Sequence, residues 1–153
     1  MNQPAPPNPA AVLPILWGAL TMAQVMIVGI GFFLAIEQGV TPTFAMDRLL
    51  PGDGPGAVFY GLAFVVAVSA LVVPPKLALT GKNERSDAAR AMTPFILQMA
   101  FAEAATLMGF VGALFMTTPA VPERLLLPAA AGLLAAVLGF PSPSRLKTLA
   151  GRA

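Results

Sequence analysis

The sequence has no cysteine, no histidine and few charges, since only 10% of its residues are Asp, Glu, Lys or Arg. The absence of cysteine excludes disulfides and thiolate metal sites. The absence of histidine removes the commonest metal ligand and the usual general base near neutral pH. We therefore expect no metal site, no cofactor and no enzymatic activity. The net charge of +2 is too small to indicate a nucleic-acid partner.

Low charge goes together with high hydrophobicity. Apolar residues make up 57% of the chain, and the mean hydropathy is +0.78. A soluble domain typically carries about 25% charged residues, and a chain this short cannot hide so much apolar surface from water. The composition predicts an all-α, polytopic membrane protein of the inner (cytoplasmic) membrane, with the lipid bilayer as its main partner.

Four apolar segments, at residues 10–36, 56–73, 91–116 and 121–140, predict four transmembrane helices, because about 20 residues cross the hydrocarbon core. They form a predicted bundle over residues 10–140. Residues 1–9 are rich in Pro and Asn, carry no charged side chain, and predict a disordered tail. Residues 141–153 predict a basic cytoplasmic tail. We expect proline to end the second segment, at Pro74 and Pro75, and the fourth, at Pro141.

The basic residues indicate how the segments are oriented. Four lie between the second and third segments and three in the C-terminal tail, whereas the other two connections hold only Arg48 and Arg124. Lys and Arg prefer the cytoplasmic side of a membrane. Both termini and the middle connection are therefore predicted to be inside.

The first and third segments resemble each other, which suggests an internal duplication. Pro14 and Pro94 lie near their starts, and Gly29 and Gly109 follow at the same separation from these prolines. The second and fourth segments both end in proline followed by a basic residue. The pattern predicts two helical hairpins that repeat in parallel.

Glu103 is the most unusual residue, because it lies near the middle of the third segment with no other ionisable side chain between Arg90 and Glu123. An acid inside a membrane is costly and is usually protonated, paired or functional. Burial disfavours its charged form, so we expect a neutral carboxyl group. Gln24 occupies a matching depth in the first segment, and we expect it to hydrogen-bond to Glu103.

A stripe of small and polar residues runs along the third segment at helical spacing. Such stripes let membrane helices approach closely, so we expect this one to pack against a matching stripe on the first segment. The third-segment stripe consists of Gln98, Ala102, Thr106, Gly109 and Ala113, and the first-segment stripe of Trp17, Thr21, Gln24, Val28, Gly31 and Ala35.

The third segment also resembles one known helix. Its run from Met99 to Val111 reads MAFAEAATLMGFV, in which Glu103 follows a small residue, precedes Ala104 and is followed six positions later by Gly109. This resembles the carboxyl-bearing helix of subunit c, the proteolipid of rotary ATP synthases. The resemblance implies that Glu103 binds a transported proton or sodium ion and that the hairpins assemble into a ring. The whole chain looks like the small four-span proteins of bacterial membranes.

Two functions remain open. The first is a non-enzymatic membrane component that packs through its small-residue faces against itself or within a larger membrane complex. The second is a proton- or sodium-binding, proteolipid-like subunit of an ion-translocating complex, in which Glu103 binds the ion with help from Gln24 and Thr106. A third class, an enzyme acting on lipid, is disfavoured because no paired acids accompany the missing histidine and cysteine.

Overall fold

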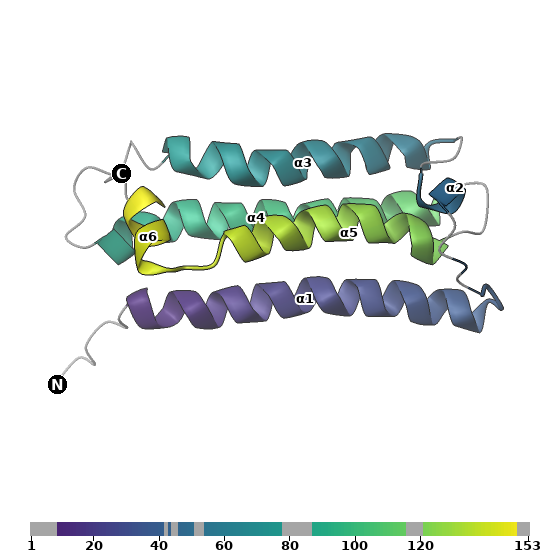
Figure 1. Ribbon diagram of the computed structural model, residues 1–153, viewed down its shortest axis with the longest axis horizontal. Coiled ribbons are helices and arrows are strands. Elements are labelled where there is room, and N and C mark those ends of the chain that lie inside the picture. Colours follow the sequence, from purple (N-terminus) through teal and green to yellow (C-terminus); the bar gives the residue numbers. More distant parts are fainter. Residues whose placement is uncertain are drawn as a thin grey trace, which may run out of the picture.

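The computed structural model describes residues 9–41, 43, 46–50, 54–77, 87–115 and 121–149, and all regular structure in these ranges is helical (Figure 1). The predicted tail therefore lies outside the described residues, except for Pro9. The helices are α1 (Pro9–Glu37), α2 (Met46–Leu49), α3 (Gly56–Leu77), α4 (Asp87–Leu114), α5 (Val121–Leu138) and α6 (Pro143–Leu149).

Three of these helices are long and apolar enough to cross a membrane, namely α1, α3 and α4 over Ala11–Glu37, Gly56–Lys76 and Arg90–Leu114. The shorter α5 is the fourth long helix of the bundle. Large hydrophobic side chains are exposed on the outer faces, among them Ile15, Val65 and Leu134. Such a surface is unfavourable in water and suits lipid, so the chain is a multi-pass membrane protein by length and composition.

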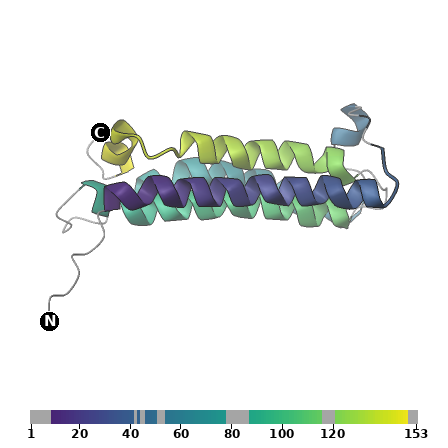
Figure 2. The same cartoon turned by 90° about the horizontal axis from the view of Figure 1, so that it is seen from below.

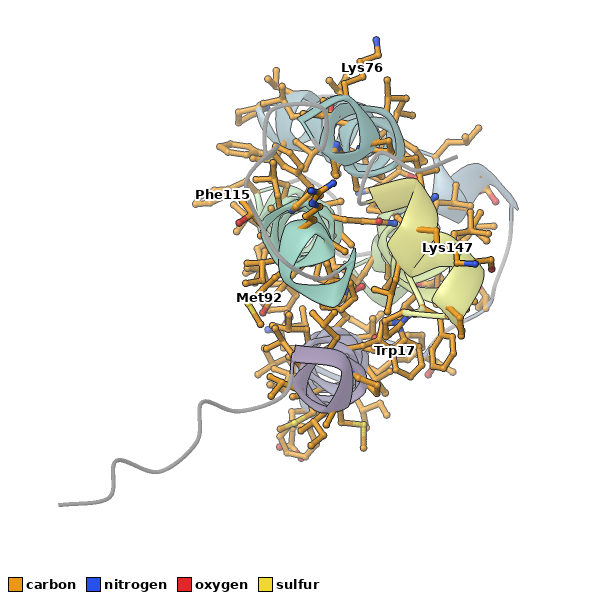
Figure 3. The ribbon with its side chains drawn as sticks, turned by 90° about the vertical axis from the view of Figure 1, so that its left-hand side faces the viewer. Trp17, Lys76, Met92, Phe115 and Lys147 are labelled. Carbon is orange, nitrogen blue, oxygen red and sulfur yellow. The ribbon has the colours of Figure 1, made fainter. Side chains whose placement is uncertain are left out.

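The four long helices alternate in direction, and α4 and α5 form the centre of the bundle. In Figure 1, α3 lies above this pair and α1 below it, and the two further views agree (Figures 2 and 3). The predicted hairpins are therefore not equivalent in how their helices pack. Helices α4 and α5 lie side by side, whereas α1 and α3 are separated by them. The long connection at residues 38–55 makes this possible, because it carries the chain past the end of the central pair.

Proline does not end α3 where the sequence predicted, although α5 ends at Leu138, before Pro141. Helix α3 continues through Pro74 and Pro75 to Leu77. Proline removes one N–H hydrogen bond to the carbonyl four residues earlier. Near a helix end this costs few bonds, since only the carbonyls of Ala70 and Leu71 lose their partners in α3. Proline therefore marks the end of α3 only approximately.

Helix α1 ends in a well-defined cap. Gly39 has a φ of 73°, in the left-handed region. The N–H of Gly39 donates to Ile36 O at 2.9 Å, and the N–H of Val40 donates to Ala35 O at 2.9 Å. This pair of bonds satisfies carbonyls that would otherwise lack partners and turns the chain away from the helix axis.

The core cluster lies where α1, α3, α4 and α5 meet, toward the end of the bundle at which α1 begins, and α3 contributes Ala70 to it. It contains Leu13, Phe95, Met99 and Ala102, each fully buried, with Ala135 and Ala136 of α5. Leu146 of α6 packs against this core. Helix α6 therefore folds back over this end of the bundle, where Figure 3 shows it nearest the viewer.

Candidate functional site

A polar contact joins three helices near the middle of the bundle; we call it the central node and define it as Gln24, Thr106 and Gly132. Gln24 of α1 and Thr106 of α4 are both fully buried. The Thr106 hydroxyl lies 3.4 Å from Gln24 Oε1 and 3.4 Å from the carbonyl oxygen of Ala102. Since a hydroxyl has one hydrogen, these two acceptors share it. The node therefore links α1 to α4 through a long, weak bond.

Helix α5 reaches the central node through Gly132, which has no side chain. A Cβ atom at this position would overlap Thr106 Oγ1 and would lie only 2.7 Å from the carbonyl oxygen of Ala102. Any other residue would push α5 away from α4. Glycine is therefore required here by close approach rather than by backbone conformation.

The central node contains more hydrogen-bonding capacity than it uses. Gln24 Nε2 and the nearby hydroxyl oxygen of Thr21 are both buried, and neither has a hydrogen-bond partner among the described residues. An unpaired amide inside a membrane is costly because lipid cannot bond to it. The α1 side of this contact is therefore only partly satisfied.

Glu103 is not the partner of Gln24, which corrects the predicted bond. Gln24 accepts from Thr106, and its Nε2 reaches no acceptor. Glu103 itself is partly exposed, and the hydrogen bonds and ion pairs of the described residues do not include it. On a helical wheel of α4, Thr106 lies between the side that faces α5 and the position of Glu103. Glu103 therefore lies at the edge of the contact with α1.

The predicted small-residue stripe is buried along α4, and it faces α5 as well as α1. Gln98, Ala102, Gly109 and Ala113 are all buried. Gly109 lies against Pro128 of α5, where no Cβ would fit. On α1, Gly31 is buried and Thr21 is intermediate. The stripe is therefore the seam on which both α5 and α1 pack.

A second polar cluster closes the bundle at the end where α1 begins; we call it the end network and define it as Trp17, Gln98, Ala135, Ala136 and Arg145. Gln98 Nε2 donates to Ala135 O at 3.2 Å, and Trp17 Nε1 donates to Ala136 O at 2.8 Å. Arg145 Nη2 of α6 donates to Gln98 Oε1 at 3.0 Å. The network joins α1, α4, α5 and α6.

The end network adds hydrogen bonds at the last turn of α5, where Ala135 and Ala136 lie. Their carbonyl oxygens each accept the backbone N–H of Gly139 at 3.0 Å. They also accept bonds from Gln98 and Trp17, which belong to other helices, so each carbonyl uses its second lone pair within the protein. The positive Arg145 also lies close to the negative end of the α5 dipole, which is favourable.

The opposite end of the bundle contains a buried charged pair of residues at the start of α5. Glu123 is fully buried and Arg124 is 6% exposed. Glu123 Oε1 accepts the backbone N–H of Thr43 at 3.0 Å, and Tyr60 of α3 donates its hydroxyl to Leu49 O at 2.6 Å. These bonds fasten the 38–55 connection to the bundle. The bond between Thr43 and Glu123 could not be predicted from a local pattern, because the two residues are 80 positions apart.

The described polar side chains show contacts between helices rather than a reactive arrangement. No group of three or more His, Cys, Asp or Glu side chains in the described ranges could hold a metal ion. Neither threonine of the α1–α4 contact, Thr21 or Thr106, has a general base beside it.

No protein-family model matches the sequence, and no curated protein or solved structure is similar to it.

Proposed function

We propose that the chain is an integral protein of the inner (cytoplasmic) membrane that crosses the bilayer four times, with both termini inside. The basic residues support this orientation, since Lys76, Arg145 and Lys147 lie at the end where α1 begins. Helix α5 serves as the fourth crossing. It is shorter and less apolar than the others, but α1, α3 and α4 cover much of its surface. In this topology the two out-and-back pairs, α1–α3 and α4–α5, repeat in parallel.

Labelling of single cysteines tests the topology, because the natural sequence contains none. Lys147→Cys and Gln38→Cys place a thiol at an exposed position at either end of the bundle. In intact cells stripped of the outer membrane, a membrane-impermeant maleimide should label the Gln38 variant and spare the Lys147 variant until the cells are lysed. The reverse pattern, or labelling of both, would overturn the orientation.

Within this topology the chain acts as a non-enzymatic helix-packing component that associates with itself or with a larger membrane complex. The observation that carries this proposal is that two buried polar side chains of α4 bond to neighbouring helices. Gln98 bonds to α5, and Thr106 bonds to Gln24 of α1. In this role Glu103 is a neutral carboxyl group.

A second function, proton or sodium binding at Glu103, is favoured by one specific observation. The Glu103 side chain is partly exposed and is not held by Gln24, so it is available to an ion. The resemblance of its helix to that of subunit c supports the same role, with Thr106 and Gln24 as neighbouring oxygen donors. Gln24 Oε1 and Thr106 Oγ1 already lie near each other.

Reaction with a hydrophobic carbodiimide separates the two functions. Ion binding predicts rapid labelling of Glu103 that sodium or added acid alters strongly. The packing role predicts slow labelling that neither condition changes. Glu103→Gln is the control in both cases, because it removes the reactive carboxyl group and keeps the side-chain size. Sodium-sensitive labelling would overturn the packing role.

A further inference from the structure

None of the described helices covers the side of α4 that faces away from α5; we call this side the open face and define it as Ile96, Ala100, Glu103, Leu107 and Leu114. Ile96, Leu107 and Leu114 are between 43% and 47% exposed. Figure 3 shows the same side on the left, where Met92 and Phe115 point outward between α1 and α3. The open face is therefore available to another molecule.

Glu103 makes this face unlike the other exposed surfaces. It lies near the centre of the Arg90–Leu114 span, about 20 Å from Arg90 and about 17 Å from Leu114 at about 1.5 Å per residue. A Glu side chain is too short to reach water from that depth, and lipid tails offer no hydrogen bond. The described exposed surfaces of α1 and α3, which include Met26 and Val65, present apolar side chains at this level. Glu103 thus requires a polar partner from outside the protomer.

We propose that two copies of this chain associate through the open face of α4, and that their Glu103 carboxyl groups hydrogen-bond to each other at the centre of the membrane. The inference rests on the packing role proposed above, in which Glu103 is neutral. A neutral carboxyl group has one donor and one acceptor, so it is complementary to a second copy of itself. A two-fold axis along the membrane normal brings identical residues together at identical depth.

The neighbours of Glu103 permit such an approach. Ala100 is exposed and Ala104 is partly exposed on the same side of α4. The two alanines are four positions apart, which is a spacing typical of close helix pairs. Small side chains at this spacing let the backbones of two membrane helices come close enough for short polar side chains to meet. Leu107 and Ile96, one turn or two away, supply the apolar contact around the carboxyl pair.

Cysteine cross-linking tests the contact, since the natural chain has no cysteine. In native membranes, Ala100→Cys should form a disulfide dimer on mild oxidation. Val65→Cys on α3 and Met26→Cys on α1 are matched controls, because both positions are about 61% exposed, and they should stay monomeric. An Ala100 variant that stays monomeric, or controls that cross-link equally well, would overturn the proposal.

Substitutions of Glu103 test the hydrogen bond itself. In the Ala100→Cys background, Glu103→Gln should keep the dimer, because an amide also donates and accepts. Glu103→Leu should weaken dimerisation about tenfold, the scale of a strong interhelical hydrogen bond in a membrane. Since Glu103 has no bond within the described protomer, neither change should alter its thermal unfolding. Equal dimerisation of the leucine variant would overturn the role of the carboxyl pair.

Ala104→Leu provides a variant with Glu103 intact. It adds bulk to the open face and should prevent dimerisation while the protomer still folds. Failure of the topology and failure of the dimer are distinguishable, because the Lys147 and Gln38 probes report the first and the Ala100 cross-link the second. A correct topology with a monomeric Ala100 variant would overturn the dimer alone.

Discussion

Two buried glutamines occupy the same bundle in different ways. Gln98 and Gln24 are both fully buried. Gln98 donates to a carbonyl of α5 and accepts from Arg145, at 3.2 and 3.0 Å. Gln24 makes one long contact of 3.4 Å, and its Nε2 has no partner among the described residues. Both ends of the Gln98 amide are thus paired, whereas Gln24 leaves its Nε2 unpaired; in the end network the unpaired buried atom is Arg145 Nε.

This difference indicates where the bundle is fixed and where it can adapt. A buried polar group contributes stability when it is satisfied and subtracts from it when it is not. The end network fixes the relative positions of four helices through three hydrogen bonds between them. The central node holds its three helices mainly by close packing around Gly132. Substitutions at the two sites should therefore change the free energy of unfolding by different amounts, and even in opposite directions.

The largest effect is expected at Gly132 itself. Gly132→Val places a side chain against Thr106 and the Ala102 carbonyl, and it should reduce the free energy of unfolding by about 3 kcal/mol or more. The measurement is the unfolding of the purified protein in mixed detergent micelles, followed by circular dichroism. Gly29→Val is the control, because nothing lies within 4 Å of a Cβ there. Equal stability of the two variants would show that α5 does not approach this closely.

Gln98→Leu should come next. It removes the bonds to Ala135 and Arg145. The Ala135 carbonyl keeps the N–H of Gly139, but the Arg145 guanidinium loses its described partner, so we expect a loss of about 2–3 kcal/mol. The same unfolding measurement applies. A loss below about 1 kcal/mol, the worth of a single ordinary hydrogen bond, would show that the two bonds of Gln98 do not both contribute.

Arg145→Met should destabilise the protein by about 1–2 kcal/mol, since the guanidinium is only partly buried and its main described contact is with Gln98. Lys147→Met, at an exposed position on the same helix, is the matched control and should have no measurable effect. In a double-mutant cycle the Gln98 and Arg145 changes should be less than additive. Full additivity would show that the two side chains do not interact.

Gln24→Leu should have the smallest effect. It removes one weak contact and also an unpaired buried amide, so the free energy of unfolding should change by less than about 1 kcal/mol and could increase. A loss as large as that of Gln98→Leu would contradict the contrast between the two glutamines. It would indicate that the central node is satisfied by groups outside the protomer.

The sequence predicted the all-α class and three of the candidate spans, because long apolar runs in lipid allow only helices. It placed Gln24 at the depth of Glu103, within one helical turn of Thr106, since depth follows directly from the rise per residue. It did not predict that Thr106 rather than Glu103 meets Gln24. A helical wheel gives the direction of a side chain, and the choice between neighbours on one face depends on where the other helices lie.

The parts that could not be predicted depend on distant segments. Arg145 and Gln98 are 47 residues apart, and Trp17 and Ala136 are 119 apart. No local pattern links them, because each bond forms only after α5 and α6 have folded against α1 and α4. Gly132 carries a weak signal as the only glycine inside the fourth apolar segment before Gly139. Its neighbours emerge only from the packing of three helices.

The separation of α1 from α3 has a consequence for the order in which the protein is made. A ribosome delivers α1 and α3 first, yet the inner faces of both helices contact the central pair that follows. The two early helices therefore enter the bilayer without their final neighbours, and the polar face of α1 has no helix to contact until α4 inserts. The bundle is therefore assembled from its outer helices inward, and it is complete only when α5 has joined the helices already in place.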